Sequence, residues 1–233
     1  MFDLIAFDAD DTLWHTEELY VGTQDRFKQL LAPYHSAEWI DKKLFDTEMR
    51  NLAVFGYGIK GFTLSMIETA IELTEGRIGG GEIQCIIDMA REMFNAEVRL
   101  LDGVAETVAA LAPRFALMII TKGDLFDQES KVARSGLGPY FEHVEIVSDK
   151  TEASYAALLK RHQVAPERFL MVGNSLRSDI LPVARLGAKA VYIPYHLTWA
   201  HEMVSETQLG ENRYVTLESF GLLPALLDEL AGA

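Results

Sequence analysis

Five short apolar segments, each followed by a polar or glycine-containing turn, constrain the fold of this chain more than any other feature. They cover residues 2–7, 115–121, 143–148, 169–173 and 188–193. The first is too short for a helix, and we interpret all five as buried strands. Segments with helical spacing lie between and after them, at residues 104–111, 125–135, 152–162, 179–186 and 220–230. Strands that alternate with helices predict an α/β fold, with a parallel sheet covered by helices on both faces.

Residues 17–97 interrupt this alternation. They show no convincing strand pattern but have helical periods at 17–32, 37–51, 62–75 and 82–95. Glycine-rich breaks at residues 56–58 and 79–81 separate the later helices. We therefore expect a helical cap inserted after the first strand. The predicted division is a core domain of residues 1–15 and 98–233 and a cap domain of residues 16–97.

Charge and cysteine content limit the function classes. Acidic residues outnumber basic ones 35 to 21, and the net charge of −14 disfavours binding to nucleic acid or to anionic membranes. Cys85 is the only cysteine, which excludes an intramolecular disulfide and fits a reducing compartment. We expect it to be a buried, inert thiol on a cap helix. We see no secretory leader or long apolar span and therefore expect a cytoplasmic protein. We expect it to be a monomer or a homodimer.

Three aspartates, Asp8, Asp10 and Asp11, follow the first predicted strand directly. Adjacent carboxylates repel each other unless a cation or a shared proton relieves the repulsion. Mg²⁺ takes oxygen ligands and is usually bound by one or two carboxylates together with a substrate phosphate. A single aspartate here would as readily be an ordinary turn residue. The group of three favours a magnesium site.

Further polar groups follow three of the later strands. They are Thr121-Lys122-Gly123-Asp124, Lys150, and the segment from Asn174 to Asp179. The Thr121 hydroxyl and the free amides at the helix N-terminus that follows it suit an anion. Taken alone, Lys150 would be an ordinary surface lysine. The segment from Asn174 to Asp179, taken alone, would be a turn that caps a helix. Because α/β sheets build their sites at the carboxyl ends of the strands, we expect all the groups to contribute to one site.

The ordered set resembles the four motifs of the haloacid dehalogenase superfamily. The matching elements are Asp-x-Asp-x-Thr-Leu after the first strand, Thr after the second, Lys near the third, and Gly-[Asp/Asn]-x-x-x-x-Asp after the fourth. With its helical insertion, the resemblance covers nearly the whole chain. It implies a Rossmann-like parallel sheet core with an inserted α-helical cap. Asn174 stands where many members carry Asp, and we expect activity to survive this departure.

The resemblance also implies a mechanism. It makes Asp8 the nucleophile that becomes an aspartyl phosphate, and Asp10 the acid and then the base. Mg²⁺ would be held by the Asp8 carboxylate, the Asp10 backbone carbonyl and the Asp179 carboxylate, with Asn174 beside the ion. The substrate phosphate would be bound by Thr121, Lys122 and Lys150.

Several functions remain open at this stage. Phosphatase members keep an Asp two residues after the nucleophile, as Asp10 is here, and this favours a phosphatase acting on a small phosphorylated metabolite. A hydrolytic 2-haloacid dehalogenase would not need that acid, and a mutase would need a basic cap. A non-catalytic regulatory or binding protein of the same fold is the alternative from another class, with only Asn174 in its favour. In the cap, Lys60 is expected either to contact the substrate or to be a solvated loop lysine.

Overall fold

The computed structural model describes residues 2–205, 209 and 214–232, and the chain divides into two compact units. The sheet unit comprises Met1–Glu17, Val98–Lys122 and Glu129–Ala233. The helical unit comprises Glu18–Glu97 and Gly123–Gln128. The short segment Gly123–Gln128 groups with the helical unit although it is far from it in sequence, which the sequence pattern did not indicate.

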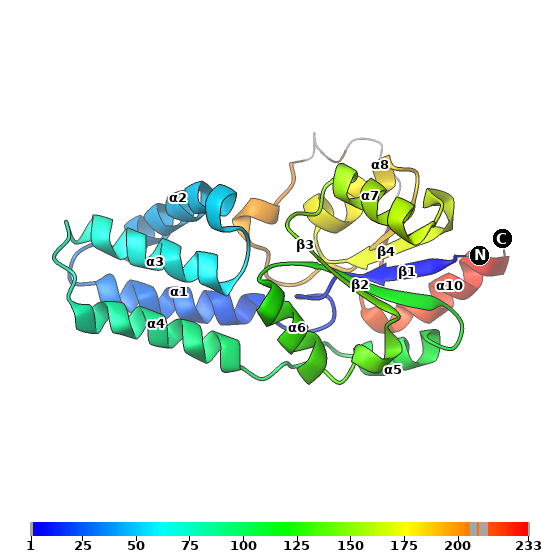
Figure 1. Cartoon of the computed structure of the whole chain (residues 1–233), viewed down its shortest axis with the longest axis horizontal. Helices are drawn as coiled ribbons and strands as arrows, with labels where there is room; N and C mark the ends of the chain where they lie inside the picture. The colour runs from blue at the N-terminus through cyan, green and yellow to red at the C-terminus, as the bar shows by residue number, and fades with distance from the viewer. Residues whose placement is uncertain (1, 206–208, 210–213, 233) are drawn as a thin grey trace. The chain divides into compact units, whose positions relative to one another are not determined.

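A six-stranded sheet forms the centre of the sheet unit, and its described strand pairs are all parallel (Figure 1). The predicted α/β fold with a parallel sheet is thereby confirmed. The strand order β3-β2-β1-β4-β5-β6 places β1 in the interior, with later strands on both sides of it. The strands are β1 (Leu4–Phe7), β2 (Ala116–Lys122), β3 (His143–Val147), β4 (Phe169–Gly173), β5 (Lys189–Tyr192) and β6 (Val215–Thr216). β6 was not predicted, because two residues carry no periodic pattern.

Helices cover both faces of this sheet, and successive side chains of each strand point to opposite faces. Ile5 and Phe7 of β1 pack with α5 and α10, whereas Leu4 and Ala6 pack with α7 and α8. The helices are α5 (Val104–Leu111), α6 (Leu125–Arg134), α7 (Glu152–His162), α8 (Leu181–Arg185) and α10 (Leu223–Gly232). Short 3-10 helices lie at Gly138–Tyr140, Pro166–Arg168, Ala200–Glu202 and Phe220–Leu222, and a π-helical turn at Leu176–Ile180.

The helical unit is built mainly from four helices that share an apolar core. They are α1 (Glu17–Leu31), α2 (Ala37–Phe55), α3 (Ile59–Leu73) and α4 (Gly80–Asn95). The prediction that Cys85 is buried is wrong, because its side chain is exposed. The buried face of α4 is formed by Ile86, Met89, Ala90 and Met93. Cys85 lies about 90° of helix rotation from the middle of that face and so falls outside it.

The start of α3 contacts the segment before α6 within the helical unit. Lys60 Nζ lies 2.8 Å from Asp124 Oδ2. Gly58 has a φ of 111°, and a Cβ at this residue would lie 2.8 Å from the Asp124 amide nitrogen, so the close approach requires glycine. Lys60 therefore has a partner inside its own unit, and a contact with substrate stays a prediction.

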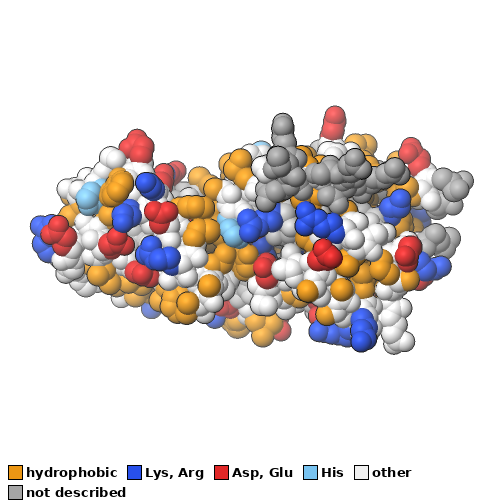
Figure 2. Space-filling view, turned by 90° about the horizontal axis from the view of Figure 1, so that it is seen from above, with side chains coloured by type: hydrophobic (Ala, Val, Ile, Leu, Met, Phe, Trp, Pro, Cys, Tyr) orange, Lys and Arg blue, Asp and Glu red, His pale blue; other side chains and the backbone are white. Residues whose placement is uncertain are grey.

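Charged side chains of both signs are interspersed on the face drawn in Figure 2. The surplus of acidic groups is thus not gathered into one patch on that face. None of the helices in the described part of the chain has the length and apolar character needed to cross a membrane.

Candidate active site

The carboxyl ends of neighbouring strands bring Asp8 together with two of the predicted site residues, Lys150 and Asp179. Asp8 follows β1, and its amide donates to the Val172 carbonyl of β4 at 2.9 Å, which continues the pairing of the two strands. Thr121 is buried near the end of β2, and Lys150 follows β3. Because β1 lies between β2 and β4, with later strands on either side, its end is the switch point where such sheets bind ligands.

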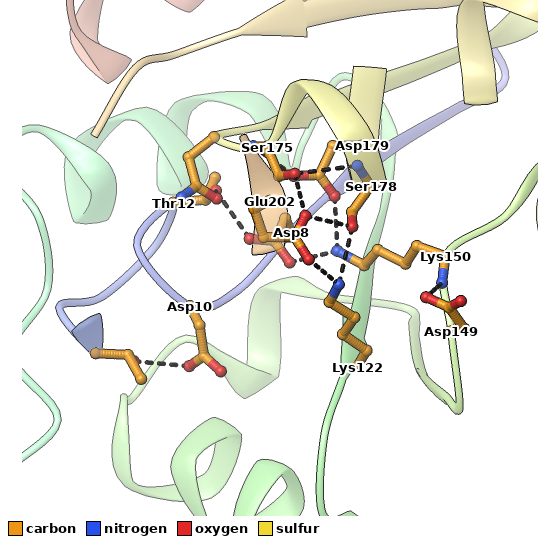
Figure 3. A network of polar contacts seen from close by, with 12 residues as sticks. Asp8, Asp10, Thr12, Lys122, Asp149, Lys150, Ser175, Ser178, Asp179 and Glu202 are labelled. Atoms are coloured by element: carbon orange, nitrogen blue, oxygen red, sulfur yellow. Dashed lines mark hydrogen bonds and ion pairs between the residues drawn. The ribbon is translucent and has the colours of Figure 1, made fainter. Parts of the chain in front are cut away.

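A buried lysine joins two buried carboxylates at this point (Figure 3). Lys150 Nζ donates to Asp8 Oδ1 and, at 2.8 Å, to Asp179 Oδ1. The exposed fractions are 4% for Lys150, 7% for Asp8 and 1% for Asp179. Two such carboxylates would repel each other strongly, and the shared ammonium relieves the repulsion.

Burial shapes the proton affinities of this group. It raises the pKa of Asp8 to about 7, with the Lys150 ammonium opposing the rise and the Asp179 carboxylate adding to it. Burial alone would lower the pKa of Lys150, but Asp179 and Asp8 hold that pKa above its ordinary value. A second cation beside Asp8 would therefore favour its ionised form further.

Thr12 links Asp8 to Asn174. Its Oγ1 lies 3.0 Å from Asp8 Oδ2 and 3.1 Å from Asn174 Oδ1, within hydrogen-bond distance of both. The amide oxygen of Asn174 thus belongs to the same network as the predicted nucleophile. Thr12 is part of the Asp-x-Asp-x-Thr-Leu motif, but its place in this network was not predicted.

The turn after β4 fixes Asp179. The Ser175 amide donates to Asp179 Oδ2 at 3.0 Å, and the π-helical turn carries Asp179 back toward β4. Its carboxylate then lies against Gly173, where an added Cβ would be 2.3 Å from Asp179 Oδ2. Glycine is required at residue 173 because any side chain would displace this carboxylate.

Lys122 lies in a second ion pair that the sequence did not predict. Its Nζ donates to Ser178 Oγ at 2.8 Å and to Glu202. Glu202 also accepts hydrogen bonds from the hydroxyls of Ser175 and Ser178 (Figure 3). It is separated from Lys122 by 80 residues and lies in a 3-10 helix, so no local pattern pointed to it. Binding of substrate phosphate by Lys122 stays a prediction.

Replacing Glu202 by Gln should lower stability at neutral pH much more than in acid. Burial alone would raise the pKa of Glu202, but Lys122 and the two serines lower it to about 2 from an ordinary 4.5. The ionised Glu202 carboxylate therefore stabilises the fold by about 3 kcal/mol above pH 4.5. This contribution is lost as the pH falls toward 2 and the carboxylate becomes protonated.

Thermal unfolding at pH 7, 4 and 3 checks this expectation. The difference in Tm between the wild type and E202Q should narrow as the pH falls. E167Q, which changes an exposed glutamate, is the matched control and should behave as the wild type. A difference that stays constant with pH would contradict the role of the Glu202 charge.

The Asp10 side chain lies apart from the group of Asp8, Lys150 and Asp179 (Figure 3). Its Oδ1 accepts from Trp14 Nε1 at 2.8 Å, from Thr16 Oγ1 at 2.8 Å and from Lys131 Nζ at 3.0 Å. Its carboxylate is about a quarter exposed. Asp8, the predicted nucleophile, and Asp10, the predicted acid and base, thus have different surroundings.

Asp11 binds backbone amides at the start of α1. It adopts a φ of 61°, and its Oδ1 accepts from the amides of Thr16 at 2.8 Å and Glu17 at 3.0 Å. These amides stand at the beginning of α1, where no intrahelical acceptor serves them. The side chains of the three neighbouring aspartates therefore have different partners.

The donor set around Asp8 fits Mg²⁺. Two carboxylates, Asp8 and Asp179, and the amide oxygen of Asn174 are hard oxygen donors joined through Lys150 and Thr12. Within residues 2–205, 209 and 214–232, no three His, Cys, Asp or Glu side chains converge on a common metal position. The Asp10 side chain is held elsewhere, so a contribution of Asp10 through its backbone carbonyl stays a prediction.

A family model described as haloacid dehalogenase-like hydrolase matches residues 2–187. The crystal structure of a haloacid dehalogenase-like family hydrolase from Xanthomonas campestris is 41% identical in sequence, with a TM-score of 0.88. This similarity covers 99% of the present chain and 92% of that chain. A 2-haloacid dehalogenase from Pseudomonas syringae pv. Tomato DC3000, 21% identical, shares the fold over 99% of this chain and all of its own, with a TM-score of 0.65.

Among curated relatives, a glyceraldehyde 3-phosphate phosphatase from Pyrococcus furiosus is 33% identical over 104 residues. This match covers 42% of the present chain and 43% of the relative, so it spans less than half of either protein.

Proposed function

Because the chain belongs to the haloacid dehalogenase-like hydrolase family, we propose that it is a Mg²⁺-dependent phosphatase of a small phosphorylated metabolite. The observation that carries this proposal is the Lys150 ammonium shared by the buried carboxylates of Asp8 and Asp179. It supplies positive charge where an anionic nucleophile would meet an anionic phosphate. The partial match to a glyceraldehyde 3-phosphate phosphatase supports the same reaction class.

In the proposed reaction an Asp8 oxygen attacks phosphorus. The new oxygen–phosphorus bond forms as the ester bond breaks, and Asp10 gives its proton to the departing oxygen. Water then attacks the aspartyl phosphate, Asp10 takes the proton of that water, and inorganic phosphate leaves. Asp8 and Asp10 return to their starting protonation states. Asp10 favours this chemistry over dehalogenation, which needs no acid at that position.

Charge stabilisation is the main task of the remaining residues, since phosphoryl transfer depends mostly on positioning and electrostatics. Lys150 opposes the protonation of Asp8 and orients its carboxylate through direct contact. Asp8, Asp179 and Asn174 would hold Mg²⁺, with the Asp10 backbone carbonyl. The ion would neutralise the negative charge of the substrate phosphate. Thr121 and Lys150 would bind the phosphate oxygens, as would Lys122 if its contact with Glu202 opens.

Phosphate release should depend on a divalent cation. The purified protein should hydrolyse p-nitrophenyl phosphate and at least one member of a panel of phosphorylated metabolites that includes glyceraldehyde 3-phosphate. Excess EDTA should abolish the release and added Mg²⁺ should restore it, because without the ion the charge of the substrate phosphate is not compensated.

A preparation of the D8N variant purified in parallel reports phosphate released by contaminating enzymes. Full turnover in EDTA would contradict the Mg²⁺ dependence. Halide release from a 2-haloacid in preference to phosphate would favour the dehalogenase alternative. No release from any compound would favour a non-catalytic protein.

A further inference from the structure

Glu202 fills a group of hydrogen-bond donors that suits an anion. One of its carboxylate oxygens accepts from Lys122, and the other accepts from the hydroxyls of Ser175 and Ser178. An ammonium and two hydroxyls around one charged group can bind a phosphate as well as a carboxylate. Burial alone would raise the pKa of Glu202, but these donors lower it to about 2, so the carboxylate is ionised at neutral pH. The chain itself thus supplies the anion that these donors bind.

The same donors flank the predicted nucleophile. Lys122 ends β2 and the two serines follow β4, whereas Asp8 follows β1, the strand between β2 and β4. Asp8 is connected to Glu202 by hydrogen bonds that pass through three residues, Lys150, Asp179 and Ser175 (Figure 3). A phosphate group that Asp8 attacks would therefore lie next to the donors that Glu202 fills.

Glu202 comes to these donors from the opposite side of Asp8. It lies in the 3-10 helix Ala200–Glu202, in the segment after β5, and β5 is separated from β2 by β4 and β1. The pair of Lys122 and Glu202 therefore spans the carboxyl ends of β1 and β4. The segment lies at the surface of the sheet unit, since Met203, next to Glu202, is 67% exposed. An outward shift of this segment would uncover the donors.

A phosphate group would be repelled by the ionised Glu202. The Glu202 side chain is only 12% exposed, so water screens little of its charge. The carboxylates of Asp8 and Asp179 add further negative charge to the same network. Exchange of Glu202 for phosphate, in contrast, keeps an anion beside Lys122, so no buried cation is left unpaired. Exchange is therefore more favourable than binding of phosphate beside Glu202.

We propose that Glu202 competes with the phosphate group for Lys122 and the two serine hydroxyls, and so weakens the binding of inorganic phosphate, the reaction product. This inference rests on the proposed phosphatase function. A substrate has contacts through its non-reacting part that help it to displace Glu202, and inorganic phosphate lacks them. The return of Glu202 to Lys122 after the reaction favours the release of phosphate. Glu202 itself forms no bond to phosphorus.

Inhibition by inorganic phosphate measures this competition. E202Q removes the charge and keeps the size of the side chain, so the inhibition constant of phosphate should fall by about 10-fold or more. KM for the best ester of the panel should fall with it. E167Q should match the wild type in assays with Mg²⁺ below the unfolding temperature of E202Q. If Glu202 only stabilises the fold, or only holds Lys122 in place for the phosphate, E202Q should bind phosphate no more tightly than the wild type, which would overturn the inference.

A measurement on the wild type covers the case in which E202Q folds poorly. Tungstate, a tetrahedral dianion like phosphate, is added with Mg²⁺ at a concentration that inhibits hydrolysis, and carboxyl groups are labelled with a carbodiimide and an amine. Mass spectrometry should show more label on Glu202 with tungstate than without, because the side chain leaves its buried position. The label on the exposed Glu167 should not change. An active wild type whose Glu202 gains no label contradicts this inference alone, whereas a wild type that hydrolyses no ester contradicts the proposed function.

Discussion

Asp8→Asn is expected to remove phosphate release almost entirely, by at least about 10⁴-fold in kcat. An amide oxygen is a poor nucleophile, so no aspartyl phosphate forms. The substitution also removes the carboxylate that shares the Lys150 ammonium with Asp179. Steady-state assays with Mg²⁺ give the rate, and intact-protein mass spectrometry after rapid acid quench reports the phosphorylated protein. The wild type should show the added phosphate and D8N should not.

The folded state should tolerate this substitution. Lys150 keeps Asp179 as its partner in D8N, so no buried charge is left alone. The Tm of D8N should therefore stay close to that of the wild type, which separates lost chemistry from lost structure. D228N, which alters a carboxylate exposed on α10, is the matched control and should retain full activity. Turnover of D8N near the wild-type rate would show that Asp8 is not the nucleophile.

Lys150→Met should be the most destabilising of the site substitutions. It leaves the buried carboxylates of Asp8 and Asp179 without the ammonium that both contact. Removing one partner from a buried ion pair typically costs about 3–5 kcal/mol, because the remaining charge stays desolvated. Urea unfolding at pH 7.5 measures the change in the free energy of unfolding. K160M, which removes an exposed lysine of α7, should change it by less than about 0.5 kcal/mol.

The pH dependence identifies the cause of that loss. The pKa of Asp8 is already about 7 with Lys150 present, and loss of the ammonium raises it further. At pH 5.5 Asp8 is then protonated in the folded variant, so one of the two unpaired charges is gone. The destabilisation of K150M should therefore be smaller at pH 5.5 than at pH 7.5. An equal loss at both values, or a loss below about 1 kcal/mol at pH 7.5, would contradict the electrostatic account.

Much of the fold could be predicted from local patterns. Buried parallel strands are short apolar segments, and β1, β2, β3, β4 and β5 were all recognisable as such. Asp8, Lys150 and Asp179 come together because the carboxyl ends of parallel strands meet at one edge of the sheet. The common direction of the strands accounts for that meeting, so it could be expected from sequence before any distance was known.

The tertiary structure decided which polar groups pair with one another. Glu202 reaches Lys122 across 80 residues and Lys131 reaches Asp10 across 121, and neither pair leaves a local pattern. Asp8, Asp10 and Asp11 look alike in sequence, but the backbone turns between them and their side chains point in different directions. Asp8 contacts Lys150, Asp10 contacts Lys131, and Asp11 accepts from the amides at the start of α1. Periodicity reports which residues are buried, whereas the partner of a buried charge depends on packing between segments that are distant in the chain.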